Sequence, residues 1–298
     1  MKLAQFTTKN GPAVGVELNG RWLDYGKAET AYLLLLHNII SEPVASIPDM
    51  FDEDGLNVDG MKEVLRFIRA SHMERYLLLG NDAKLRAPIE RPPKIVALGL
   101  NYVLHAKEGN FDVPEEPILF VKVGSSVVGP GETIRIPRGL GRMDHEVELA
   151  AVIAKRATGV KKRDAYNYIA GYCICNDVSA RDLQIKDLAK KHPWFRSKSF
   201  DTFSPLGPWL VTADEFPPPV HLRLECRVNG RLRQRANTRD LIFDLPAIIE
   251  YVTRYITLEP GDIISTGTPE GIGPITGGDT VACRIEGIGE LKNPVRYR

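Results

Sequence analysis

The sequence predicts an α+β protein in which β-strands dominate, with a small N-terminal α/β domain over residues 1–90 and a larger domain over residues 91–298. Three observations lead to this expectation. Short segments of alternating polar and apolar residues open the chain, and two longer segments with helical spacing follow them. A proline-rich stretch then interrupts the pattern. Beyond it, apolar runs recur between Gly, Pro and Asp, as expected of buried strands.

The N-terminal domain is expected to contain three strands followed by two helices. The strands lie at Lys2–Thr7, Ala13–Leu18 and Arg21–Asp24, and the helices lie around Ala28–Ile40 and Met61–Leu79. Residues 86–94 contain three prolines, which fix an extended backbone and remove hydrogen-bond donors. We therefore place a domain boundary near residue 90.

The second domain is expected to be rich in strands and to contain few helices. The predicted strands are Ile95–Leu98, Ile118–Val123, Glu146–Ala154, Ile169–Asn176, Leu222–Val228 and Asp279–Ile285. Helices are expected at Arg163–Tyr168 and Asp244–Thr253. A run of arginines surrounds Asn229-Gly230, a turn signal for a hairpin, so we interpret this charge as the solvated face of a hairpin.

Composition argues against several classes of partner. Lys and Arg number 39 against 38 Asp and Glu, so no long-range field attracts nucleic acid or an anionic membrane. The first residues lack the apolar run of a signal peptide, and no apolar stretch is long enough to span a bilayer. These features predict a cytoplasmic protein. The four cysteines form no CxxC pair and are expected to be buried free thiols.

Paired carboxylates at the start of an apolar strand are the strongest chemical signal. Glu146 and Glu148 share one face of a strand because successive side chains alternate. Asp177 ends the next buried strand. An isolated ExE pattern more often belongs to a solvated edge, but three acids without a His or Cys cluster suit a hard cation, Mg²⁺ or Mn²⁺. Alternation turns His145 away from the glutamates, and Asp144 is left outside the ligand set.

Six motifs in the second domain resemble those of the fumarylacetoacetate hydrolase family, and they occur in the family's order over roughly residues 90–298. The first two are Gly99-Leu-Asn-Tyr-Val-Leu-His-Ala-Lys-Glu108 and Pro117-Ile-Leu-Phe-Val-Lys122. The next two are Asp144-His-Glu-Val-Glu-Leu-Ala-Ala-Val-Ile153 and Asn176-Asp-Val-Ser-Ala-Arg-Asp-Leu-Gln184. The last two are Ser197-Lys-Ser-Phe-Asp-Thr-Phe-Ser-Pro-Leu-Gly-Pro208 and Gly261-Asp-Ile-Ile-Ser-Thr-Gly-Thr-Pro-Glu-Gly-Ile-Gly273.

This resemblance implies a mixed β-roll or β-sandwich fold, usually dimeric, with roles for individual residues. The metal ligands would be Glu146, Glu148 and Asp177. The catalytic residues would be His105, Glu108 and Lys198, and the substrate site would include Lys122, Arg181, Gln184 and Thr268. One departure is that Leu104 stands where many members have Asp. From the residues alone, Arg181 and Gln184 fit an ordinary helix start equally well.

The implied substrate is a small 2-oxo acid, whose carboxylate and carbonyl oxygens can chelate an open-sided ion and react through a metal-bound enolate. The leading expectation is hydrolysis of a carbon–carbon bond in an acylpyruvate or fumarylacetoacetate-like diketo acid. The alternatives are decarboxylation or tautomerisation of oxaloacetate, and isomerisation or decarboxylation of a hydroxymuconate-like diacid in aromatic catabolism. A non-catalytic metal-binding scaffold is the alternative of another class.

Overall fold

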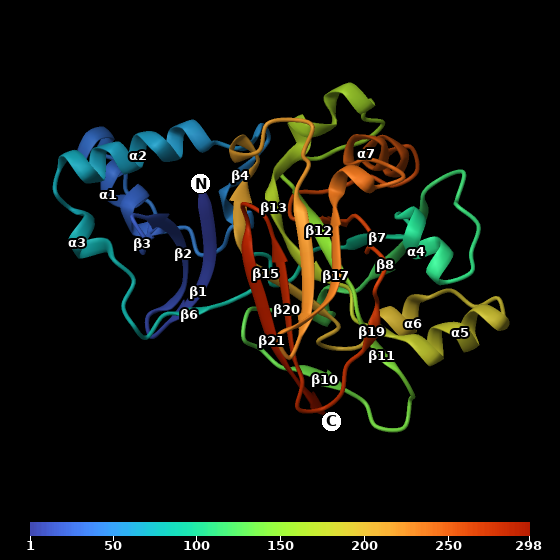
Figure 1. Cartoon of the computed structure of the whole chain (residues 1–298). Helices are drawn as coiled ribbons and strands as arrows, with labels where there is room; N and C mark the ends of the chain where they lie inside the picture. The colour runs from blue at the N-terminus through green and yellow to red at the C-terminus, as the bar shows by residue number, and fades with distance from the viewer.

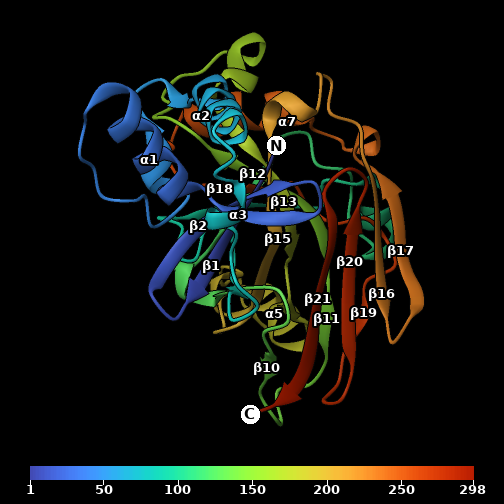
Figure 2. The same cartoon turned by 90° about the vertical axis from the view of Figure 1, so that its left-hand side faces the viewer.

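The computed structural model describes residues 1–298 and contains two large β-sheets packed face to face (Figures 1 and 2). The first sheet has 11 strands, with the main order β3-β2-β1-β15-β13-β12-β18-β7-β8. The second has five strands in the order β10-β21-β20-β16-β17. The expected β-dominant α+β fold is confirmed.

The strands have the following bounds. In the first sheet they are β1 (Lys2–Thr8), β2 (Gly11–Leu18), β3 (Arg21–Asp24), β6 (Lys84–Leu85), β7 (Ile95–Gly99), β8 (Ile118–Lys122), β9 (Val127–Val128), β12 (Val147–Ile153), β13 (Ile169–Asn176), β15 (Ser204–Thr212) and β18 (Ile263–Ser265). In the second they are β10 (Ile134–Ile136), β16 (Arg223–Val228), β17 (Arg231–Asn237), β20 (Thr280–Ile285) and β21 (Gly289–Tyr297). Two small sheets contain β4 (Phe51–Asp52) with β5 (Gly55–Leu56), and β11 (Met143–His145) with β14 (Ser179–Ala180) and β19 (Gly273–Pro274).

The α-helices are α1 (Tyr25–His37), α2 (Val58–Ala70), α3 (Glu74–Leu77), α4 (Val103–Glu108), α5 (Arg181–Ala189), α6 (Phe195–Lys198) and α7 (Leu245–Thr253). The segment predicted as a helix at Arg163–Tyr168 forms a 3₁₀ helix over Lys162–Tyr168. No helix is long and apolar enough to cross a membrane.

The central strand β12 is buried on both faces, which explains its apolar sequence from Leu149 to Ile153. Leu149 and Ala151 point into a core shared with the second sheet. Ala150 and Val152 point into a separate core that includes residues of α1 and α2. The strand that carries the carboxylates is therefore held from two sides, which fixes its register and the direction of each side chain.

The N-terminal segment continues the large sheet. β1 pairs antiparallel with β15, with Lys2 opposite Val211, and α1 and α2 cover the second core (Figure 2). The boundary near residue 90 remains a prediction, because the sheet and this core both extend across it.

The prediction of one long helix over Met61–Leu79 was wrong in its extent. Helix α2 begins after Asn57, whose side chain accepts a hydrogen bond from Gly60 N–H, and it ends at Ala70. His72 then adopts a left-handed conformation with φ of 55°, which stops the helix before α3 begins. The predicted thiols behave as expected, because all four cysteines are buried and free.

Candidate metal centre and cavity

Three buried carboxylates from neighbouring strands meet at one point. Glu146 links β11 to β12, Glu148 lies on β12, and Asp177 follows β13. The two long strands pair antiparallel with Val147 opposite Asn176, so the start of one lies beside the end of the other. One oxygen of each carboxylate lies within 4.8 Å of the other two. The three predicted ligands are thus brought together.

Burial and neighbouring charges affect the two glutamates in opposite ways. Burial opposes ionisation of Glu146, but the adjacent Lys198 and Arg181 outweigh it and lower the pKa of this carboxyl. Burial, together with the negative charges of Asp177 and Glu146, raises the pKa of Glu148 to about 8. Glu148 is therefore the acid that most needs a further positive charge beside it.

Glu148 also has an oxygen without a partner. Its Oε2 accepts hydrogen bonds from the Ser265 hydroxyl at 2.6 Å and from Gly267 N–H at 2.9 Å, whereas Oε1 is buried and has no hydrogen-bond partner. A buried polar atom left unpaired is costly, and a cation would remove both this cost and the repulsion among the acids. An all-carboxylate donor set suits Mg²⁺ or Mn²⁺. Glu146, Glu148 and Asp177 would hold such an ion.

Positive side chains surround the carboxylates. The Lys198 ammonium is buried and donates to Glu146 Oε2 at 2.8 Å and to Asp177 Oδ2 at 2.5 Å. Arg181 donates to Asp144 Oδ2 at 2.9 Å and also to Glu146. Each carboxylate offers about four lone-pair sites, so these contacts leave room for a metal ion.

Lys122 does not face the cavity, although it was predicted to line the substrate site. Its side chain is 0% exposed and does not line the cavity. The ammonium donates to Asp177 Oδ1 at 2.6 Å and to the backbone carbonyl of Lys198. The segment that contains Lys198 covers the end of strand β8, so the Lys122 ammonium does not reach solvent. This geometry supports a role for Lys122 in orienting Asp177.

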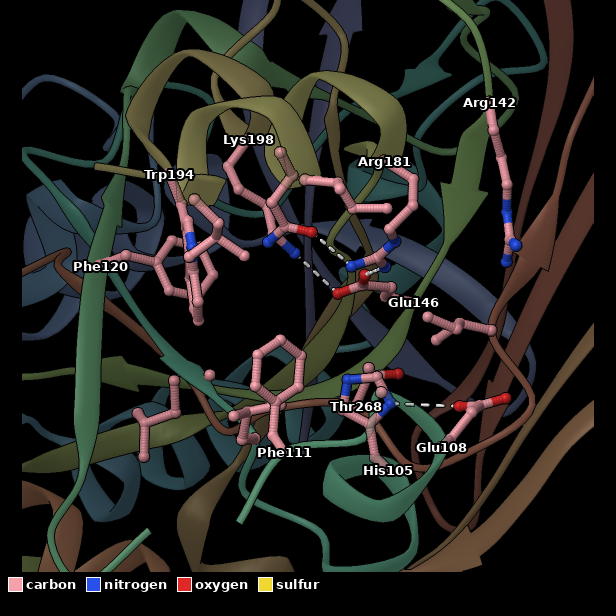
Figure 3. A pocket seen from close by; sticks show the side chains of 18 residues that line it. His105, Glu108, Phe111, Phe120, Arg142, Glu146, Arg181, Trp194, Lys198 and Thr268 are labelled. Atoms are coloured by element: carbon pink, nitrogen blue, oxygen red, sulfur yellow. Dashed lines mark hydrogen bonds and ion pairs between the residues drawn. The ribbon is translucent and has the colours of Figure 1, made fainter. Parts of the chain in front are cut away.

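Helix α4 places His105 and Glu108 on one side, as expected for residues three positions apart. His105 Nδ1 lies 3.3 Å from Glu108 Oε2. Gly271 N–H in turn donates to Glu108 Oε1 at 3.1 Å. Figure 3 shows this pair entering from α4 on the side opposite Lys198 and Arg181, with Glu146 between them. Leu104 is exposed, and the side chain within hydrogen-bond reach of His105 Nδ1 is that of Glu108.

A cavity of about 660 Å³ separates the helix α4 pair from the carboxylates. The predicted residues that line it are His105, Glu108, Glu146, Arg181, Gln184, Lys198 and Thr268, whereas Glu148 and Asp177 lie beneath its floor. The Thr268 hydroxyl donates to the backbone carbonyl of Val147 at 3.0 Å, so its hydrogen is already committed within the protein.

Sequence reasoning missed two groups in the cavity wall. Phe120 and Trp194 form an edge-to-face pair with ring centroids 5.7 Å apart, and Gly99 permits this packing because a Cβ there would lie 2.4 Å from the Trp194 ring. Arg142 stands across the cavity from them and donates to Asp144 at 2.6 Å (Figure 3). Phe120 belongs to the motif Pro117–Lys122, which gave no role to its ring, and no local pattern indicated Arg142.

The raised pKa of Glu148 predicts how stability of the metal-free protein depends on pH. A carboxyl whose pKa rises from 4.5 to about 8 on folding contributes stability that is lost as pH increases from about 5 to 8. Glu148→Gln resembles the protonated form and removes this dependence. We expect the stability of Glu148→Gln relative to wild type to grow by up to about 1.4 kcal/mol per pH unit over that range.

Urea unfolding of both proteins in EDTA at several pH values measures this difference. The electrostatic description is wrong if the difference stays constant with pH. Addition of Mn²⁺ at pH 8 should reverse the order of stability, because only the wild type retains all three ligands.

Comparisons with known proteins agree with this geometry. Residues 94–296 match the model of the fumarylacetoacetate (FAA) hydrolase C-terminal family. Oxaloacetate tautomerase fahd2 of Xenopus laevis, a mitochondrial protein, is 44% identical over 228 residues, which cover 74% of this chain and 71% of the relative. The structure of 5-carboxymethyl-2-hydroxymuconate delta-isomerase from Mycobacterium smegmatis has a TM-score of 0.77 and 35% identity over 100% of both chains.

A third relative was solved with ligands. Fumarylpyruvate hydrolase from Pseudomonas aeruginosa, in complex with Mn²⁺ and pyruvate, has a TM-score of 0.67 and 31% identity, and the match covers 72% of this chain and 92% of that one. The family match extends over the segments that carry all three carboxylates and the helix α4 pair. This chain therefore belongs to the fumarylacetoacetate hydrolase family.

Proposed function

We propose that this protein is a Mg²⁺- or Mn²⁺-dependent enzyme that interconverts the keto and enol forms of a 2-oxo diacid, with oxaloacetate as the first candidate. The observation that carries the proposal is the placement of His105 and Glu108 across one cavity from three convergent carboxylates. The 44% identity to an oxaloacetate tautomerase supports tautomerisation ahead of hydrolysis, which the sequence motifs favoured. The complex of the hydrolase relative with Mn²⁺ and pyruvate supports the choice of ion and of substrate class.

The reaction moves one proton between a carbon and an oxygen. A divalent ion on the carboxylates would supply positive charge beside the 2-oxo group and so favour loss of a proton from the adjacent carbon. Glu108 accepts from His105 Nδ1–H, which leaves Nε2 free to take that proton. Lys198 and Arg181 provide fixed positive charge where negative charge develops on the substrate oxygens. Return of the proton from Nε2 to oxygen completes the exchange.

Hydrolysis of an acylpyruvate is the second candidate, and the size of the cavity favours it. A volume of about 660 Å³ is typical of sites for drug-sized ligands and exceeds what a four-carbon diacid fills. The wall formed by Phe120 and Trp194 offers an apolar surface for an acyl group. In this reaction the His105 Nε2 would take a proton from water, and the products would be pyruvate and a carboxylic acid.

A product assay separates these outcomes. We expect the protein with Mg²⁺ to accelerate the decay of the ultraviolet absorbance of enol-oxaloacetate, relative to Mg²⁺ alone, without release of carbon dioxide. Carbon dioxide release above the metal-only rate would indicate a decarboxylase, and pyruvate from acetylpyruvate would indicate a hydrolase. Absence of all three activities, with Mg²⁺ or Mn²⁺ present, would contradict the proposal.

Two further expectations remain predictions. A homodimer is proposed on the resemblance to the family, and sedimentation of the full chain tests it. The cytoplasmic location expected from the N-terminus also stays a prediction, and the Xenopus relative is mitochondrial.

A further inference from the structure

Gln234 is a buried amide in a strand that otherwise faces solvent. It lies on β17, where it is 1% exposed while its neighbours Arg233 and Arg235 are exposed. β17 is the edge strand of the second sheet, whereas Glu148 lies on β12 of the first sheet. A buried side-chain amide needs partners for four hydrogen bonds, two as acceptor and two as donor.

All four hydrogen bonds are made, two at the amide oxygen and two at the amide nitrogen. Oε1 accepts from His145 Nδ1 at 3.0 Å and from Val147 N–H at 3.1 Å. Nε2 donates to the Thr268 hydroxyl and to the Pro269 carbonyl, both at 2.8 Å. The backbone partners fix the orientation of the amide, because only oxygen can face an N–H and only NH₂ can face a carbonyl.

These partners belong to the two segments that build the site. Val147 stands between two of the carboxylates that would hold the metal ion. Thr268 and Pro269 lie in the loop 266–272, which also contains Gly271, whose N–H donates to Glu108. The same loop includes Gly267, whose N–H donates to Glu148 at 2.9 Å. A shift of this loop against β12 would therefore move a carboxylate and the partner of His105 together.

We propose that Gln234 is a positioning residue that fixes the loop 266–272 against the carboxylate strand β12, and so sets both metal affinity and the placement of the His105–Glu108 pair. Gln234 does not line the cavity, so it acts only through the residues that it holds. The part of this proposal that concerns turnover rests on the proposed function, whereas the part that concerns metal binding does not.

A second buried amide in the same sheet provides a matched control. Asn293 on β21 is 2% exposed and donates from Nδ2 to Gly129 O at 2.8 Å and to Glu132 O at 2.9 Å. It does not line the cavity, and neither carbonyl belongs to the site. Exchange of either amide for the acid of the same shape removes two buried donors. A purely structural role for Gln234 predicts that the two exchanges have the same consequences.

The experiment compares Gln234→Glu with Asn293→Asp in the full chain. Mn²⁺ affinity is measured by the loss of the free-ion signal in electron paramagnetic resonance, and kcat and KM are measured with oxaloacetate. We expect both variants to melt at a lower temperature. Only Gln234→Glu should weaken Mn²⁺ binding and lower kcat, each by about 10- to 100-fold, which is the usual range for residues that hold metal ligands. Asn293→Asp should keep both within about twofold.

Equal loss of stability in the two variants with unchanged Mn²⁺ affinity and kcat would overturn the proposal. Gln234→Met, which lacks the added charge, gives the same comparison if Gln234→Glu does not fold. Thr268→Val removes one hydrogen bond of Gln234 and leaves Gln234 itself unchanged. The double variant should lower kcat by less than the product of the two single effects. If wild type binds Mn²⁺ but turns over no 2-oxo acid, the proposed function fails while the Mn²⁺ comparison still decides the role of Gln234.

Discussion

Glu148→Gln is expected to abolish tight Mn²⁺ binding and to lower turnover of oxaloacetate by at least about 10³-fold, since a bound ion supplies several kcal/mol of transition-state stabilisation. The substitution preserves the hydrogen bonds at this side chain. The donors that face Oε2, the Ser265 hydroxyl and Gly267 N–H, are equally well received by an amide oxygen. The variant removes one negative charge from three carboxylates that repel one another, so the fold should be retained. Titration of Mn²⁺ followed by electron paramagnetic resonance, and the enol-decay assay, measure the two effects.

A matched variant controls for the loss of any buried carboxylate. Asp262 is also buried, burial also raises its pKa, and it pairs with Lys94 outside the cavity. Asp262→Asn should lower stability but leave Mn²⁺ affinity and turnover close to wild type. If Glu148→Gln retained full turnover in Mg²⁺, or if EDTA left the wild type active, the three carboxylates would not be the metal centre of the reaction.

The second-domain strands could be predicted because their signals are local. The apolar runs of β12 and β13 reflect burial on both faces, and the turn Asn229-Gly230 forms with φ of 51° and 78°, as its sequence indicates. Alternation placed Glu146 and Glu148 on one face and Asp177 at the end of a strand, whereas their joint role as metal ligands was implied by the family resemblance. These features require only the residue and its near neighbours.

Features that depend on distant partners could not be predicted in this way. Lys122 stands at a strand end, which normally faces solvent, and only the packing of the segment around Lys198 buries it. Helix α2 stops at Ala70 without a Gly or Pro to mark the stop. Gln234 carried a weak signal, since arginines at 231, 233 and 235 turn outward and place it inward, but its four partners come from two distant segments.

His105→Ala is expected to lower kcat for oxaloacetate by about 10²–10⁴-fold, the usual contribution of a positioned general base. His105 Nε2 is the free nitrogen of a ring whose Nδ1 faces Glu108 at 3.3 Å, and the ring lines the cavity opposite Lys198. The side chain is not part of the carboxylate cluster, so Mn²⁺ affinity should remain near that of wild type. Measurement of kcat and of Mn²⁺ binding on the same preparation separates loss of the base from loss of the ion.

Glu108→Gln distinguishes orientation from basicity, because an amide oxygen at the Oε2 position can still accept from His105 Nδ1–H and from Gly271 N–H, while the negative charge beside His105 is lost. Its kcat should therefore fall less than that of His105→Ala. Lys107, exposed on the same helix, is the control, and Lys107→Ala should leave kcat unchanged.

A scaffold that keeps the metal site only for assembly has no need of the His105–Glu108 pair. If His105→Ala and Glu108→Gln both turned over 2-oxo acids as wild type does, the base would lie elsewhere. If wild type itself turned over none, the scaffold would become the better explanation.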